Sequence, residues 1–130
     1  MANITLVDDD ENIVTSVSLA LESHGHTVKS YYDGAAGLAA LEAEPPDLAI
    51  LDVKMPRMDG MEATRQIRTM AGPAGQTPII ALTANADPDD AKTYLACGMC
   101  SVVEKPIKPE RLLAAMNLAL GGGEAAVRAA

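Results

Sequence analysis

The 130-residue sequence has no phenylalanine and no tryptophan, and tyrosine occurs only three times. A core must therefore be built from Leu, Ile, Val, Ala and Met. The sequence also lacks an apolar run long enough to span a bilayer and a charged-then-apolar leader at its amino end. Lys and Arg number 10 against 18 Asp and Glu, and the formal charge of −8 argues against a nucleic-acid or anionic-membrane surface. We expect one cytoplasmic domain without direct nucleic-acid or membrane partners.

Cysteine is scarce as well, since Cys97 and Cys100 form a single C-x-x-C. A redox or metal site of this type needs a helix N-terminus after the first cysteine, or a second pair of ligands. Gly98 instead indicates the end of a preceding helix, and the two histidines, His24 and His26, lie far away in the sequence. We expect ordinary reduced cysteines and two solvent-facing histidines on a loop.

The clearest structural signal is the apolar run 48–51, which lies between Asp47 and Asp52. Four apolar residues between two acids are typical of a short strand that is buried on both faces of a parallel sheet. A proline and the turn signal Asp59-Gly60 follow, so no helix begins directly after Asp52. A helix-capping role for Asp52 is therefore disfavoured, and we expect a chemical role.

Short apolar runs alternate with helical patterns along the whole chain. Strands are predicted at 4–7, 27–31, 48–51, 78–83 and 101–104. Helices are predicted at about 13–25, 35–44, 60–70, 88–98 and 109–121, with a loop at 72–75. This alternation predicts an α/β fold with a doubly wound, five-stranded parallel sheet in the flavodoxin-like order 2-1-3-4-5. The domain would occupy residues 1–120, and 121–130 would form a flexible tail.

Candidate functional residues follow the predicted strands at their carboxyl ends, where ligands of such sheets bind. These residues are Asp8, Asp9, Asp52, Thr83 and Lys105. Three converging carboxylates repel one another, and a hard, oxygen-lined site suits Mg²⁺. A lysine and a hydroxyl beside them would hold an anion, and a carboxylate placed there could attack phosphorus. Taken singly, the acids could cap a helix, the threonine could end a strand and the lysine could be solvated; the combination favours chemistry.

Several motifs carry a resemblance that covers the chain to about residue 120. They are Leu6-Val7-Asp8-Asp9, Leu51-Asp52 with Met55-Pro56 and Met58-Asp59-Gly60, Ala81-Leu82-Thr83-Ala84, and Lys105-Pro106. In order and separation they resemble the receiver domains of bacterial two-component response regulators. The amino half looks like the receivers of DNA-binding regulators, and the carboxyl half looks more like receivers attached to hybrid sensor kinases.

The resemblance implies that Asp52 is the phosphoacceptor, which takes a phosphoryl group from a sensor histidine kinase or a histidine phosphotransfer protein. It also implies a Mg²⁺ ion bound by Asp9 and Asp52 directly, by Asp8 through water, and by the backbone carbonyl of Lys54. The side chain of Lys54 is either a solvated lysine or a mobile cation that borders the phosphoryl group.

For the phosphoryl oxygens, the resemblance implies contacts from Lys105, Thr83 and the Ala84 backbone N–H, and it implies a cis Lys105–Pro106 bond. The Thr83 strand end would shift on phosphorylation and change a face built by the fourth helix, fifth strand and fifth helix, whose output partner is unknown. Receivers usually carry an aromatic switch residue three positions before the lysine, where this chain has Val102. The chain would be a signalling phosphoprotein rather than an enzyme.

Two other interpretations stay open. A small aspartyl-phosphate phosphatase would use Asp8 as its nucleophile and Asp10 as its general acid, but it would leave Asp52 without a task. A receiver-like binding module that signals without phosphorylation would not need the intact set of acids, threonine and lysine.

Overall fold

A computed structural model describes residues 2–55, 58–84 and 87–120 of the chain. Five parallel strands form one sheet in the order β2-β1-β3-β4-β5. The strands are β1 (Asn3–Val7), β2 (Thr27–Tyr31), β3 (Leu48–Asp52), β4 (Ile79–Thr83) and β5 (Ser101–Glu104). The predicted α/β class and flavodoxin-like strand order are confirmed.

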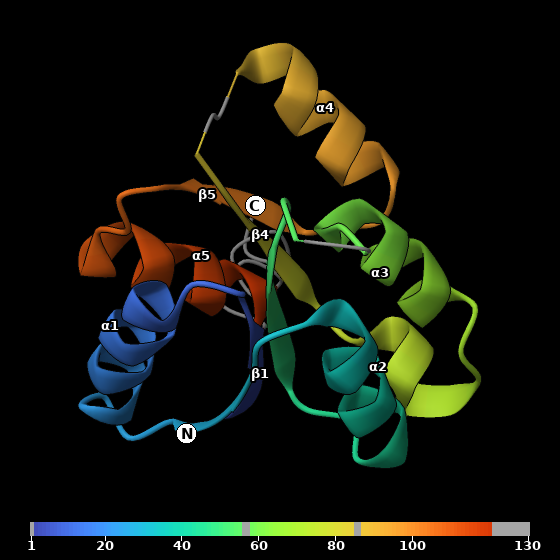
Figure 1. Cartoon of the computed structure of the whole chain (residues 1–130), viewed down its shortest axis with the longest axis horizontal. Coiled ribbons are helices and arrows are strands. Elements are labelled where there is room, and N and C mark those ends of the chain that lie inside the picture. Colours follow the sequence, from blue (N-terminus) through green and yellow to red (C-terminus); the bar gives the residue numbers. More distant parts are fainter. Residues whose placement is uncertain (1, 56–57, 85–86, 121–130) are drawn as a thin grey trace, which may run out of the picture.

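Five α-helices connect the strands and cover both faces of the sheet (Figure 1). They are α1 (Glu11–Glu22), α2 (Gly34–Ala43), α3 (Gly60–Arg68), α4 (Pro88–Ala96) and α5 (Pro109–Ala119). Side chains of α1 and α5 pack in one core cluster, and those of α2, α3 and α4 pack in the other. Each helix therefore lies in one of two outer layers, as the alternation of elements predicts.

Four of these helices begin at an aspartate that caps the first turn. The caps are Asp10, Asp33, Asp59 and Asp87, and each side chain accepts a 2.8 Å hydrogen bond from a backbone N–H of its helix. Each cap contributes about 1 kcal/mol relative to alanine. Because α1 to α4 each begin after a strand has ended, the caps fix the loops at the carboxyl edge of the sheet.

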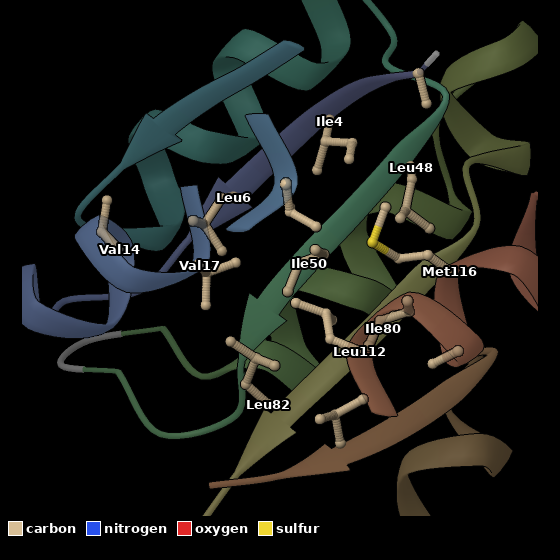
Figure 2. Close-up of a cluster of buried hydrophobic side chains, with 14 residues drawn as sticks. Ile4, Leu6, Val14, Val17, Leu48, Ile50, Ile80, Leu82, Leu112 and Met116 are labelled. Carbon is tan, nitrogen blue, oxygen red and sulfur yellow. The ribbon is translucent and has the colours of Figure 1, made fainter. Parts of the chain in front are cut away.

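The core is aliphatic, as the composition predicts. In the cluster between the sheet and the α1–α5 layer, Figure 2 shows strand residues such as Ile50 and Leu82 beside Val17 of α1 and Leu112 of α5. The central strands β3 and β4 are buried along their whole length. Among the described residues, Tyr94 in the opposite cluster is the one buried aromatic side chain.

The predicted loop at 72–75 is wrong, because Gly72–Gln76 forms a short 3₁₀ helix, η1. Gly72 has a φ of +69°, a conformation that glycine adopts without strain, and Pro73 sits in the first turn. The Arg68 side chain donates to the carbonyls of Gly75 and Thr77 at 3.1 and 2.7 Å. These bonds, from a side chain seven and nine residues away, hold the segment in a helical turn that its own composition does not predict.

His24 is exposed as predicted, but His26 is not. His26 is half-buried, and its Nδ1 accepts a 3.1 Å hydrogen bond from the Ala2 backbone N–H. Burial is the main cause that lowers the pKa of His26. The fold thus uses this side chain to hold the start of β1, a contact that sequence proximity could not reveal.

Gly98 follows α4 with a φ of +116°, so the predicted helix stop is confirmed. Within the described chain Cys97 is a half-buried free thiol and Cys100 an exposed one.

None of the described helices is long and apolar enough to cross a membrane. The predicted tail, 121–130, lies outside the described residues.

Candidate functional site

The two central acids lie at the point where the strand order reverses. Asp52 is the last residue of β3, and Asp8 directly follows β1. These strands are neighbours, with Val7 opposite Leu51, so the two acids emerge side by side at the carboxyl edge of the sheet. The chain passes from β1 to β2 on one side and to β3 on the other, so this edge is the switch point at which sheets of this kind bind ligands.

A third acid, Asp9, completes an acidic cluster with Asp8 and Asp52. Each contributes a carboxylate oxygen, and these three oxygens lie within 4.8 Å of one another. Asp8 is 0% exposed and Asp52 is 4% exposed, whereas Asp9 is exposed. The cluster is therefore closed on its protein side and open to solvent at Asp9.

Lys105 brings the positive charge to this cluster from the end of β5. Its Nζ lies 3.1 Å from Asp8 Oδ2 and 3.3 Å from Asp52 Oδ1. The backbone N–H of Lys105 donates to the Thr83 carbonyl at 2.7 Å, which ties the loop to the end of β4. One ammonium thus bridges the two buried carboxylates.

The partners of Asp8 show that these residues fit a cation. Its Oδ1 accepts a hydrogen bond from the Asp10 backbone N–H, but the buried Oδ2 accepts none from the described residues. The Lys105 ammonium forms an ion pair with that oxygen. Three carboxylates against one ammonium leave excess negative charge, and buried charge without compensation is costly. Clustered carboxylate oxygens of this kind suit a hard divalent cation.

The pKa values follow from the same crowding. Burial, and after it the negative charge of Asp8, raise the pKa of Asp52 from 3.8 to about 6, against the lowering effects of Lys105 and the Lys54 backbone N–H. Burial alone would lower the pKa of Lys105, but its contacts with Asp8 and Asp52 outweigh burial and raise it. Lys105 therefore stays charged at neutral pH. Ionisation of the buried Asp52 carboxyl costs the folded protein free energy.

The remaining predicted residues lie around this cluster. Thr83 is the buried last residue of β4, which neighbours β3, and the exposed Ala84 follows it. Lys54 is exposed, and its backbone N–H lies 3.3 Å from Asp52 Oδ1. Val102 lies in β5, opposite Ala81 of β4. It is half-buried and packs against the core cluster on the side of the sheet covered by α2, α3 and α4.

Two further observations concern the loops around the site. The Lys105–Pro106 peptide bond is cis, as the resemblance implies. Asp10, the general acid of the phosphatase interpretation, uses its carboxylate to cap α1. That interaction occupies the side chain and weakens the phosphatase interpretation.

Gly60 has a structural importance that the predicted turn, the predicted helix start and the family motif did not reveal. A Cβ at Gly60 would lie 2.6 Å from the backbone oxygen of Asp52, and the Gly60 N–H donates to the Val53 carbonyl at 2.8 Å. Gly60 is the first residue of α3, so this close approach seats the helix against the loop that carries Asp52. A glycine at the first position of a helix is the signal that would have pointed to a close backbone approach.

Comparison with known proteins agrees with this geometry. The family model of the response regulator receiver domain matches residues 4–117. Curated relatives include the transcriptional regulatory protein AfsQ1 of Streptomyces coelicolor, which is 38% identical over 95% of this chain and 53% of its own length. The response regulator ArlR of Staphylococcus epidermidis is 37% identical over 92% of this chain and 53% of its own length. The chain spans about half the length of the curated relatives it matches.

Solved structures show the same fold. The chemotaxis response regulator CheY4 of Vibrio cholerae is 33% identical, with a TM-score of 0.86, 92% of this chain covered and 99% of that one. The receiver domain of the sensor histidine kinase PA1611 of Pseudomonas aeruginosa is also 33% identical, with a TM-score of 0.84 over 92% of this chain and 98% of that one. Its magnesium ion is coordinated in the active site cleft.

The family match covers most of the chain, and the acidic cluster lies at the sheet edge where the fold places its ligands. This chain belongs to the response regulator receiver domains of two-component systems.

Proposed function

We propose that Asp52 accepts a phosphoryl group from the phosphohistidine of a sensor histidine kinase or a histidine phosphotransfer protein. The observation that carries the proposal is the position of the Asp52 carboxylate, which is buried in the acidic cluster and lies 3.3 Å from the Lys105 ammonium. A carboxylate oxygen of Asp52 attacks phosphorus, the phosphorus–nitrogen bond breaks, and the imidazole leaves with the electron pair. Phosphoryl transfer needs little covalent assistance from the protein. The protein therefore contributes by positioning the reacting groups and by neutralising the charge on the phosphoryl oxygens.

The residues that would hold Mg²⁺ are Asp9 and Asp52 directly, Asp8 through water, and Lys54 through its backbone carbonyl. When bound, the ion supplies neutralisation of the charge that builds on the phosphoryl oxygens during transfer. The buried Asp8 Oδ2, which lacks a hydrogen bond from the described residues, supports this assignment. The PA1611 receiver domain, whose cleft coordinates magnesium, supports it as well.

On the phosphoryl group itself, Lys105, Thr83 and the Ala84 backbone N–H would contact the oxygens. The Lys105 ammonium already lies between Asp8 and Asp52, so it can turn toward a group attached to Asp52 while it remains close to Asp8. Phosphorylation adds about two negative charges at neutral pH. The end of β4 must adjust to that charge, because Thr83 is its last, buried residue.

The consequence we propose is a change in the face formed by α4, β5 and α5, where an output partner would bind. The domain, residues 1–120, would act in the cytoplasm as a signalling phosphoprotein that catalyses only its own phosphorylation and dephosphorylation.

Acetyl phosphate tests this proposal without knowledge of the kinase. With Mg²⁺, the wild-type chain should gain the mass of one phosphoryl group, and Asp52→Asn should gain none, because an amide is not a nucleophile. Asp59→Asn is a matched control, since Asn caps a helix as well as Asp does and the same charge is removed; it should label like the wild type. A folded wild-type chain that never labels would favour the binding module that works without phosphorylation.

A further inference from the structure

Helix α4 is anchored to the rest of the molecule in an unusual way. Tyr94 is the one buried residue of this described helix, whereas α1 and α5 each bury three. Figure 1 shows α4 at the top of the view, at the edge of its layer, and β5 is the described element that it contacts most. Tyr94 is therefore the side chain that anchors this described helix in the core.

The surroundings of Tyr94 connect it to the phosphoryl end of β4. Tyr94 is 7% exposed and belongs to the core cluster that contains Ala81, with Val102 packed against that cluster. Ala81 and Val102 are paired in the β4–β5 ladder. Thr83 lies two residues beyond Ala81 and so on the same face of the sheet. The strand face that ends at Thr83 is thus the face that bears this cluster.

The side chains of Ala81 and Val102 are small, whereas the buried aromatic side chain of this cluster, Tyr94, comes from α4. Ala81 and Val102 are small, and a buried tyrosine covers roughly 150–250 Å². In a close-packed core, two small strand residues leave a volume that a large neighbour has to occupy. Tyr94 is the aromatic side chain among the buried residues of the cluster that contains Ala81, and Val102, which packs against that cluster, has no ring.

We propose that Tyr94 couples helix α4 to the β4–β5 edge and transmits phosphorylation of Asp52 to the α4 surface. This inference rests on the proposed function, because the phosphoryl group is what displaces the Thr83 end of β4. Packed interiors change between discrete arrangements rather than by gradual deformation. A shift of β4 therefore obliges the Tyr94 ring to repack, and α4 moves because the ring is its buried anchor. Tyr94 is a positioning residue, and it does not touch the reacting atoms.

Backbone-amide NMR of the ¹⁵N-labelled chain tests this, with acetyl phosphate and Mg²⁺ as the phosphorylating probe and intact mass as the measure of labelling. In the wild type and in Tyr94→Phe, which keeps the ring, phosphorylation should shift the amides of 89–96 as well as those of Thr83 and Ala84. In Tyr94→Leu the shifts at Thr83 and Ala84 should persist, and those of α4 should fall by at least half. Leu95→Ala is the matched control, because Leu95 is the next residue and 48% exposed; it should behave like the wild type.

Equal α4 shifts in fully labelled Tyr94→Leu and wild type would overturn the inference. A second measurement decides the matter if Tyr94→Leu does not fold. The double variant Tyr31→Phe/Tyr32→Phe leaves Tyr94 as the sole tyrosine of a chain that has no tryptophan. Its fluorescence or its quenching by acrylamide should change on complete labelling and stay constant in the added Asp52→Asn background. Constant tyrosine fluorescence and quenching in the fully labelled protein would also overturn the inference, whereas absence of labelling in the wild type would refute the proposed function beneath it.

Discussion

Removal of the Asp52 carboxylate should change how the metal-free protein responds to pH. The folded chain holds Asp52 with a pKa of about 6, raised from 3.8 first by burial and then by the charge of Asp8. Between pH 7 and pH 5 the folded state therefore takes up most of a proton at this position, while the unfolded chain keeps its aspartate ionised. Because the folded state binds more protons in this window, acidification stabilises it there.

The expected size follows from those two pKa values. Integration of the proton uptake from pH 7 to pH 5 gives about 1 kcal/mol of added stability for the wild type relative to Asp52→Asn, which cannot titrate. Carboxylates outside the acidic cluster titrate alike in both proteins, so the difference between the two reports the acidic cluster that contains Asp52. Above pH 7 that difference should level off, since both states of the wild type are then ionised.

Urea unfolding, followed by circular dichroism in EDTA at pH 7, 6 and 5, measures the difference directly. Repetition in the Asp8→Asn background should shrink the pH dependence, because one cause of the raised pKa is removed. Saturating Mg²⁺ should also shrink it, because a bound cation stabilises the ionised carboxylate. A difference between wild type and Asp52→Asn that is constant with pH, or that moves in the opposite direction, would refute this electrostatic account.

Three further predictions concern the cation and the loops around the site. At ten times its dissociation constant Mg²⁺ should stabilise the folded chain by about 1.4 kcal/mol; a melting temperature that is unmoved at matched ionic strength would contradict the metal assignment. Gly60→Ala should cost about 1–3 kcal/mol, because its Cβ would meet the Asp52 backbone oxygen at 2.6 Å; urea unfolding measures this cost, and unchanged stability would show that α3 can move away freely. Lys54→Ala should change the lifetime of the phosphoryl group on Asp52 by a few-fold, more at low salt than at high salt, because Lys54 is exposed and its charge is screened; equal lifetimes at both ionic strengths would leave its side chain as ordinary surface.

The sequence predicted the fold well because the signals involved are local. Buried strands such as β3 and β4 are short apolar runs, and the aspartates that precede the helices fix where α1 to α4 begin. The strand ends then predicted which acids would meet, since parallel strands place their carboxyl ends at one edge. The juxtaposition of Asp8, Asp9 and Asp52 follows from that topology.

What could not be predicted depends on contacts between distant parts of the chain. Arg68, which holds the 3₁₀ turn at 72–76, also donates to the distant Gly98 carbonyl, and His26 accepts from the backbone of Ala2. The burial of Tyr94, the anchor of α4, depends on a core cluster to which β4 and β5 also contribute side chains. Periodicity within one helix carries no information about the volume left by its neighbours.

The central claim is that Asp52 is the phosphoacceptor, and the most direct test is to find where the phosphoryl group resides. After incubation with acetyl phosphate and Mg²⁺, borohydride reduces an aspartyl phosphate to homoserine, which peptide mass spectrometry can place in the sequence. We predict homoserine at residue 52 alone, and none when Mg²⁺ is withheld. Homoserine at position 8, 9 or another acid, with residue 52 still aspartate, would contradict the claim.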